Sequence, residues 1–125
     1  MSCLALSLQF LEILFSGTDL HRLRPLLAAD FKFSGPMYSF DSADAYVSAL
    51  EADPPLGFGY DILGTFEKDN TAGVFYQFTK QGLAWTPPFT TPMAQYFDCK
   101  DERIVSTLLI FDRKDFDEAK AAALT

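Results

Sequence analysis

Apart from its carboxylates, this sequence has few side chains with the chemistry of a catalytic or metal-binding group, and they are scattered along the chain. His21 is the only imidazole, and no second histidine or HxxE-type spacing accompanies it, so it makes a poor metal ligand. It is typical of a surface histidine. Cys99 and His21 are residue types that can form a nucleophile and its base, but nothing in their spacing supports such a pair. We therefore expect no metal site and no cofactor.

The two cysteines, Cys3 and Cys99, are too few for a disulfide framework and lack the spacing of metal ligands. Disulfides are rare in reducing compartments, so a low cysteine count is typical of a protein with free thiols. The sequence therefore predicts reduced cysteines and a cytoplasmic location.

Several other polar side chains have a structural explanation. Asp41 and Asp44 lie three residues apart at a predicted helix start, where carboxylates cap free amides. Asp112 precedes Arg113 and Lys114 and fits an ion pair or a cap. Four aromatic side chains with a polar tip suit either a ligand with a ring system or a sheet face buried in a dimer. These are Tyr38, Tyr60, Tyr76 and Trp85.

The composition limits the function classes. The 125 residues fit one domain over 1–125. With 17 acidic and 10 basic residues the formal net charge is −7, which disfavours nucleic-acid binding and attraction to an anionic membrane, because both need clustered Lys and Arg. A hydrophobic fraction of 49% that includes 13 Phe can build a real core, which excludes a disordered chain.

The hydrophobic periodicity predicts helices in the first half of the chain. Residues 3–16 form a helix with a narrow polar face, which Gly17 ends. This apolar segment has no basic residue before it, so we interpret it as a buried helix and not as a signal peptide or membrane span. A second helix covers 20–27, with its regular part starting near Pro25. A third begins at a cap from Asp41 or Ser42 and stops before two prolines.

Strands follow, because the apolar period changes from 3.6 to 2 near residue 58. One predicted strand has Phe58, Tyr60, Ile62 and Phe66 on one face. A Pro-rich stretch at 86–92 is expected to be a long loop. The remaining predicted strands lie near 31–33, 74–78, 93–100 and 103–112, with one helical turn near 115–119. Helices followed by an antiparallel meander are typical of an α+β protein.

This order resembles the nuclear transport factor 2-like superfamily, also called the SnoaL-like or cystatin-like α+β cone. The segments that carry the resemblance are 16–19, 27–36, 41–46 and 101–112. It implies three N-terminal helices packed on a strongly curved antiparallel sheet, which forms a cone with an apolar cavity. It also implies a homodimer through the sheet face.

The resemblance also allows the catalytic positions of known enzymes of the superfamily to be compared with the residues of this chain. Isomerases of this fold carry a cavity tyrosine on the first helix and two aspartates further on, and the resemblance places Phe10, Gly35 and Ala94 at these positions. Epoxide hydrolases carry an aspartate where this chain has Leu109. Polyketide cyclases rely on a buried carboxylate that has no secure equivalent. These catalytic positions are therefore vacant.

The same registers imply which strand residues face the cavity. They place Ala94, Tyr96 and Asp98 on one strand beside Val105, Thr107, Leu109 and Phe111 on the next. Asp98 is then the candidate general base, unless it is a solvated carboxylate at the rim. Tyr96 would orient a ligand, or would be a buried tyrosine with a satisfied hydroxyl. The predicted ligand-binding residues are Phe10, Leu14, Phe33, Tyr38, Trp85, Tyr96, Thr107, Leu109 and Phe111.

Two hypotheses follow. In the first, the cone binds a small apolar or aromatic ligand, either as a binding protein or as an isomerase, cyclase or lyase. In the second, the chain is a non-catalytic association module whose sheet face dimerises and whose cavity is filled core. The first depends on polar groups inside the cone, and the second on the loss of the catalytic positions.

Overall fold

The computed structural model describes residues 1–81 and 88–123, which form one curved sheet with helices on its concave side and at its ends. The sheet order is β2-β1-β6-β5-β4-β3. The strands are β1 (Leu27–Ser34), β2 (Ser39–Phe40), β3 (Phe58–Lys68), β4 (Thr71–Lys80), β5 (Phe89–Lys100) and β6 (Arg103–Ile110). The helices are α1 (Cys3–Ser16), the 3-10 helix η1 (Leu20–Leu26), α2 (Ala43–Ala52) and α3 (Lys114–Ala123). Within these residues no helix is long and apolar enough to cross a membrane.

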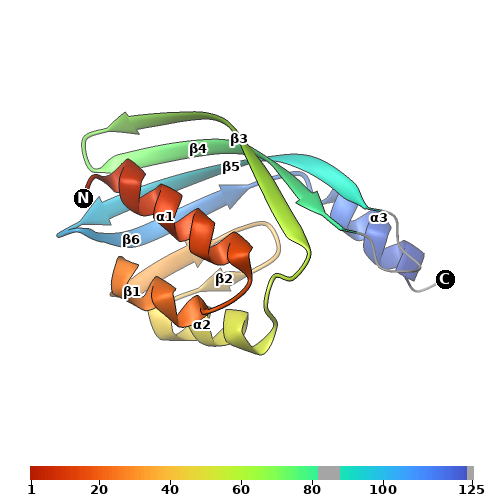
Figure 1. Ribbon diagram of the computed structural model, residues 1–125, viewed down its shortest axis with the longest axis horizontal. Coiled ribbons are helices and arrows are strands. Elements are labelled where there is room, and N and C mark those ends of the chain that lie inside the picture. Colours follow the sequence, from red (N-terminus) through yellow and green to blue (C-terminus); the bar gives the residue numbers. More distant parts are fainter. Residues whose placement is uncertain (82–87, 124–125) are drawn as a thin grey trace.

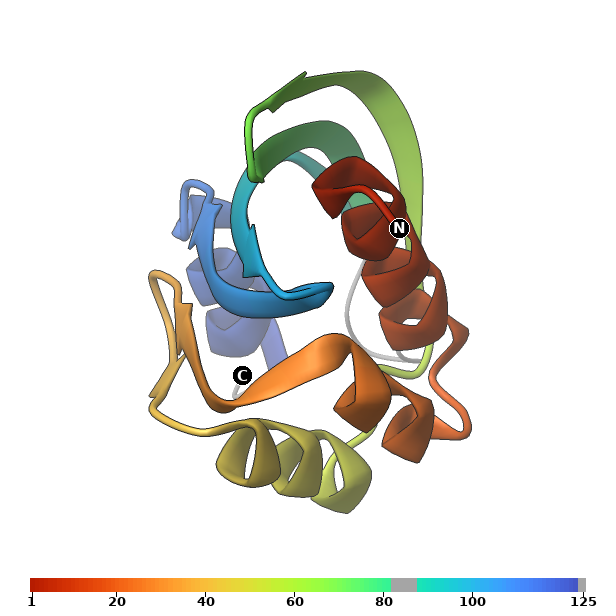
Figure 2. The same ribbon diagram turned by 90° about the vertical axis from the view of Figure 1, so that its left-hand side faces the viewer.

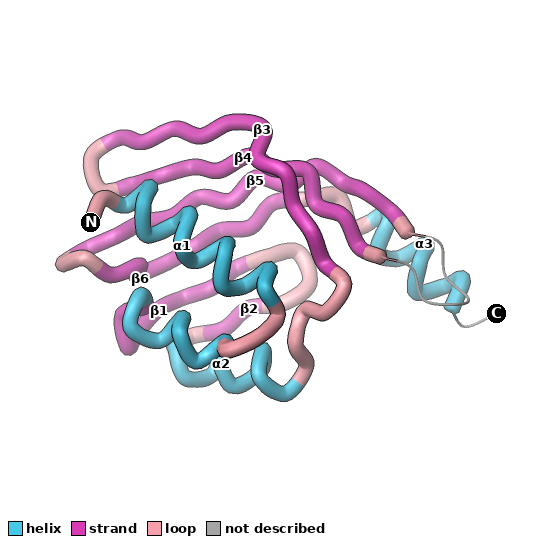
Figure 3. Tube along the Cα trace, in the orientation of Figure 1, coloured by secondary structure: helices cyan, strands magenta, loops and turns pink. Residues whose placement is uncertain are grey.

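The sheet bends strongly around α1, as the two views of the ribbon show (Figures 1 and 2). In Figure 2 the strands curl from β3 through β5 and β6 to β1, and α1 lies on the open side of the curl. α2 runs alongside β1, and α3 lies beyond one end of the strands (Figure 3). The predicted α+β cone is therefore confirmed.

Local sequence signals set the helix ends. The Ser2 hydroxyl accepts from the Ala5 amide at 3.1 Å and starts α1. Gly17 ends the helix with a left-handed φ of 70°, as its position predicts. For α2 the cap is Ser42, whose hydroxyl accepts from the Ala45 amide at 3.0 Å.

The second helix is not the predicted α-helix. Residues 20–26 form a 3-10 helix that contains Pro25, and Leu27 already begins β1. Proline has no amide hydrogen for an α-helical bond. The three buried leucines, Leu20, Leu23 and Leu26, recur every third residue. This spacing places them on one side of a helix with three residues per turn.

A β-bulge in β3 changes which face of the sheet the later side chains of this strand lie on. Tyr60 pairs with Phe78, but the register shifts between Ile62 and Gly64. Beyond the shift, Phe66 pairs with Gly73 on the convex face of the sheet. The inserted residue reverses the side on which later side chains lie, so the prediction that Phe66 shares a face with Tyr60 is wrong.

The sheet departs from the predicted meander in two further places. β1 pairs with β6 in parallel, whereas every other neighbouring pair is antiparallel. β5 begins at Phe89, so the second half of the predicted Pro-rich loop is strand. Pro92 is tolerated there because β6 pairs only as far as Ala94, which leaves Pro92 with one strand neighbour. The first half of the loop, up to residue 87, lies outside the described residues.

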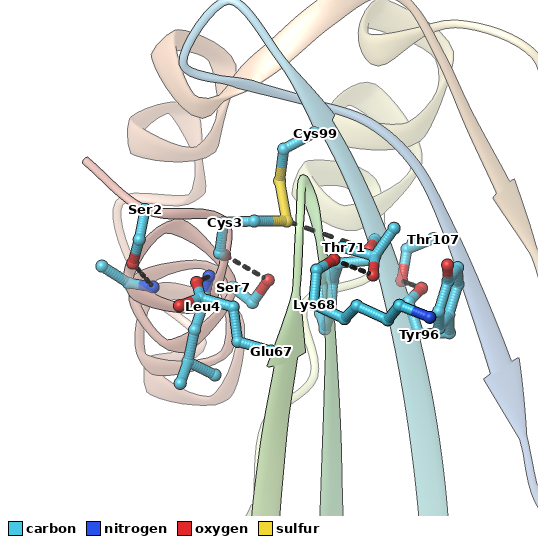
Figure 4. The surroundings of a disulfide bond; sticks show 12 residues. Ser2, Cys3, Leu4, Ser7, Glu67, Lys68, Thr71, Tyr96, Cys99 and Thr107 are labelled. Carbon is cyan, nitrogen blue, oxygen red and sulfur yellow. Dashed lines mark hydrogen bonds between the residues drawn. A yellow bond between two sulfur atoms is a disulfide. The ribbon is translucent and has the colours of Figure 1, made fainter.

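A disulfide joins Cys3 to Cys99 (Figure 4), so the prediction of reduced cysteines is wrong. The two Cα atoms lie 5.6 Å apart, within the range that a disulfide spans. The bond ties the first turn of α1 to the end of β5 across a sequence separation of 96 residues. Sequence spacing gives no sign of this contact, because only the fold brings the two segments together.

Candidate functional site

A pocket of about 700 Å³ opens at the end of the molecule opposite the disulfide. Its walls come from the second half of α1, from β1 and α2, from the late part of β4, and from β5, β6 and α3. Most of the lining is aromatic or aliphatic. The aromatic part consists of Phe15, Phe33, Tyr38, Phe40, Tyr46, Phe58, Tyr76, Phe78, Phe111 and Phe116. A pocket of this size and polarity suits a small organic molecule.

One line of polar side chains crosses the buried wall. The Tyr76 hydroxyl lies 2.9 Å from Gln95 Oε1, and Gln95 Nε2 lies 3.0 Å from Thr107 Oγ1. Thr107 Oγ1 lies 3.0 Å from the Tyr96 carbonyl oxygen. All three side chains are buried, so hydrogen bonding is what makes their burial tolerable.

The direction of donation along this line is fixed. A carbonyl only accepts, so Thr107 must donate to Tyr96 and can only accept from Gln95. The Gln95 amide nitrogen therefore faces Thr107, and its oxygen faces Tyr76. It follows that Tyr76 donates its hydroxyl hydrogen to Gln95 and has no hydrogen left for a ligand.

Tyr46 of α2 is the second buried tyrosine of the pocket, with 3% of its surface exposed. Its hydroxyl forms no hydrogen bond with any residue in 1–81 or 88–123. Burial raises the pKa of Tyr46 and the pKa of Tyr76 well above the usual tyrosine range. Both side chains are therefore neutral phenols at physiological pH, unsuited to act as a general base.

The charged groups of the lining lie at its mouth. Among the described residues they are Asp53, which is exposed, and Lys80, which is partly buried. The Lys80 ammonium lies 5.9 Å from the centre of the Phe58 ring, in a cation–π arrangement. The interior of the pocket thus offers uncharged polar groups, and charge is confined to the entrance.

The structure brings together five of the predicted ligand-binding residues. Leu14, Phe33, Tyr38, Leu109 and Phe111 all line the pocket. Whether they contact a ligand stays a prediction.

The other predicted ligand-binding residues are not among the described lining residues of the pocket. Phe10 is fully buried and packs against the Tyr46 ring, at 6.1 Å between ring centres. Thr107 is buried behind Gln95. Trp85 lies outside the described residues. Tyr96 lies on the opposite face of the sheet, as the strand register shows.

The predicted orientation of β5 is wrong. The buried residues are Thr91, Met93, Gln95, Phe97 and Cys99. Tyr96 and Asp98 therefore lie on the convex face, and Asp98 loses its place as a general base in the cavity. A one-residue slip moves every side chain of a strand to the other face. The sequence carried a signal against this slip, because Asp98 and Lys100 alternate with the apolar Phe97 and Cys99.

The remaining polar residues have structural roles, although the capping predicted for Asp41 and Asp44 is wrong, because the Ser42 hydroxyl caps α2. The Asp44 carboxylate accepts from Arg24 at 2.7 Å on the surface. Asp112 caps α3 by accepting from the Lys114 amide at 2.9 Å. His21 is exposed. Over residues 1–81 and 88–123, no three His, Cys, Asp or Glu side chains are grouped as metal ligands would be.

A second feature lies on the convex face of the sheet. Five large apolar side chains there are each between 42% and 55% exposed, and together we call them the convex patch. Cross-strand pairing lines them up in adjacent rows of the sheet. They are Phe66, Phe75, Tyr96, Leu108 and Ile110. Contiguous exposed apolar surface is typical of an interaction site.

Comparison with known proteins identifies the fold. No protein-family model and no curated protein sequence matches the chain. Solved structures do match. A nuclear transport factor 2-like protein of unknown function from Cytophaga hutchinsonii has a TM-score of 0.76 at 20% identity, covering 94% of this chain and 96% of its own. A protein from Kribbella flavida has a TM-score of 0.77 at 24% identity, with coverages of 95% and 93%.

A third match is an LEH-like epoxide hydrolase from M. tuberculosis. Its TM-score is 0.77 at 14% identity, and the match covers 98% of this chain and 92% of the hydrolase. Likeness at these identities shows a shared fold, and fold alone does not carry an activity from one protein to another.

Proposed function

We propose that this chain, which has the nuclear transport factor 2-like fold, binds a small apolar or aromatic molecule in the pocket at the wide end of the cone. The observation that carries the proposal is a pocket of about 700 Å³ with aromatic walls and a few oriented polar groups inside. Small-molecule sites commonly combine these features. Solid core filling, as the association hypothesis expects, would leave no such space.

Binding has more support than an isomerase, cyclase or lyase activity. Proton abstraction needs a base within reach of the substrate. The carboxylate among the described lining residues, Asp53, is exposed at the mouth. The inner tyrosines are neutral, and Asp98 lies on the other face of the sheet. We therefore propose a binding protein that holds its ligand without transforming it.

Filling the pocket tests this proposal. Leu109→Trp adds an indole to the pocket wall, and it is expected to weaken binding of a naphthalene-sized probe at least about tenfold. Leu108→Trp, one residue away on the convex face, is the matched control and should bind as the unmodified chain does. Calorimetric titration measures both affinities, and native mass spectrometry of the purified chain looks for a retained ligand. Equal binding by the two variants would contradict the pocket as the site.

For the convex patch we propose a homodimer through the sheet face. The support is the apolar character of the patch and its position across β3, β4, β5 and β6. Burying such surface against a second copy removes it from water.

Charge placed in the patch is expected to separate the dimer. Tyr96→Lys with Leu108→Lys puts two ammonium groups into the interface, where desolvation is unfavourable. Sedimentation velocity should change from dimer to monomer. Leu56→Lys, an exposed apolar residue outside the patch, should leave the dimer intact. A monomer in the unmodified chain at high concentration would refute the proposal.

The cytoplasmic location predicted from the cysteine count stays a prediction. The Cys3–Cys99 bond is an argument against this location, because disulfides persist mainly in oxidising compartments.

A further inference from the structure

The ring of Tyr46 is held in one orientation. Four phenylalanines from α1, β1 and β2 surround it, with ring centres between 5.1 and 6.1 Å away. Phe33 stacks nearly parallel to it, at an angle of 19°. These partners are Phe10, Phe31, Phe33 and Phe40. A phenol locked in this way presents its hydroxyl at a fixed place in the pocket wall.

That hydroxyl lacks a partner in the described parts of the chain. It is not among the fully enclosed side-chain polar atoms without a partner, which for the described residues are represented by Gln9 Oε1. The Tyr46 hydroxyl therefore has access to the open space of the pocket that Tyr46 lines. A hydroxyl that is covered by a ligand without a hydrogen bond is unfavourable.

The neighbouring bonds run from Tyr76 to Gln95, from Gln95 to Thr107 and from Thr107 to the Tyr96 carbonyl. None of them includes the Tyr46 hydroxyl. Two buried tyrosines are among the described lining residues, Tyr46 and Tyr76. Tyr76 donates its hydroxyl hydrogen to Gln95, and Tyr46 has its hydrogen free for a ligand.

The occupant of the pocket is the natural source of the missing acceptor. A charged acceptor is disfavoured in this position, because an ion in an aromatic pocket loses its hydration. Burial also keeps the Tyr46 phenol protonated by raising its pKa, so it remains a donor. A neutral oxygen satisfies both conditions.

We infer that the ligand carries a neutral hydrogen-bond-accepting oxygen, such as a ketone carbonyl, and that the Tyr46 hydroxyl donates to it. Its apolar body then lies against the aromatic wall. This inference rests on the proposed binding function, because it names the ligand chemistry of the same pocket. Tyr46 is the residue that distinguishes an oxygen-bearing ligand from a hydrocarbon of equal shape.

Two isosteric probes test the inference. 2-Acetylnaphthalene and 2-isopropenylnaphthalene differ by a carbonyl oxygen in place of a methylene group. Calorimetric titration of both against the unmodified chain and Tyr46→Phe gives a double-difference cycle. The ketone is expected to bind about fivefold to tenfold more weakly to Tyr46→Phe, while the alkene is unchanged. Infrared difference spectra of the carbonyl-labelled ketone should show a hydrogen-bonded stretch that is lost in the variant.

The controls separate this inference from the proposed function. Because the described chain leaves the hydroxyl unpartnered, Tyr46→Phe should keep its melting temperature. Tyr60→Phe, a partly buried tyrosine outside the pocket lining, should retain the preference of the unmodified chain. If both probes bind and Tyr46→Phe changes them equally, the hydrogen bond is refuted and the pocket stands. If neither probe binds the unmodified chain, the proposed function fails and the inference fails with it.

Discussion

Replacing Phe10 with alanine is expected to lower the free energy of unfolding by about 3–5 kcal/mol. Phe10 is fully buried on the inner side of α1. Its ring meets Phe97 of β5 edge-on at 5.5 Å and lies parallel to the Tyr46 ring. Truncation removes these contacts and leaves a cavity between three elements that cannot all move inward.

Urea denaturation followed by circular dichroism measures this loss. Phe75→Ala is the matched control, measured with both variants at a concentration where the chain is monomeric, because Phe75 is the same residue type at 46% exposure on the convex face. We expect it to cost about 1 kcal/mol, since much of its ring already contacts water. Similar losses in the two variants would show that α1 does not pack on the sheet as described.

Breaking the disulfide is the second large expected effect. Replacing Cys3 and Cys99 together with serine should lower the free energy of unfolding by about 2–4 kcal/mol. The bond closes a loop of 96 residues in sequence separation, so it strongly limits the unfolded chain. Cys3 lies in the first turn of α1, which has no strand-like backbone pairing to the sheet. Loss of the bond should therefore loosen that end of the helix first.

The measurement compares thermal unfolding with and without a thiol reductant. The unmodified chain should lose stability when reduced, and the double serine variant should not respond. Alkylation followed by mass spectrometry counts the free thiols before each melt. Two alkylated cysteines in the untreated chain, with no effect of reductant, would contradict the bond and favour the reduced protein that the sequence predicts.

The elements that the sequence predicts well are those whose signals are local. Gly17 supplies the left-handed φ that ends α1, and Ser42 supplies the hydroxyl that caps α2. Both effects act within one helical turn, so neighbouring residues are enough to predict them. The 3-10 helix that contains Pro25 also has a local signal, because its buried leucines recur every third residue, although an α-helix is predicted there.

The site was harder to predict, because it depends on pairing between distant strands. Alternation sorts β5 into two sets of residues but does not say which set faces α1. The sequence therefore does not identify Gln95, which belongs to the buried set, and it predicts Asp98 in the cavity. The inserted residue in β3 has the same effect on Phe66. The role of Tyr46 was out of reach, since an unpartnered hydroxyl can be identified only after every possible partner has a position.

The disulfide and the pocket lie at opposite ends of the strands, so the two ends should differ in how easily they open. At one end a covalent bond holds α1 to β5. At the other, α3 rests on the pocket through Phe116, whose ring meets Phe78, Phe89 and Phe111. Regions held by few apolar contacts open at low free energy, without global unfolding. The pocket end should therefore open more readily than the cross-linked end, which keeps the shape of the cone.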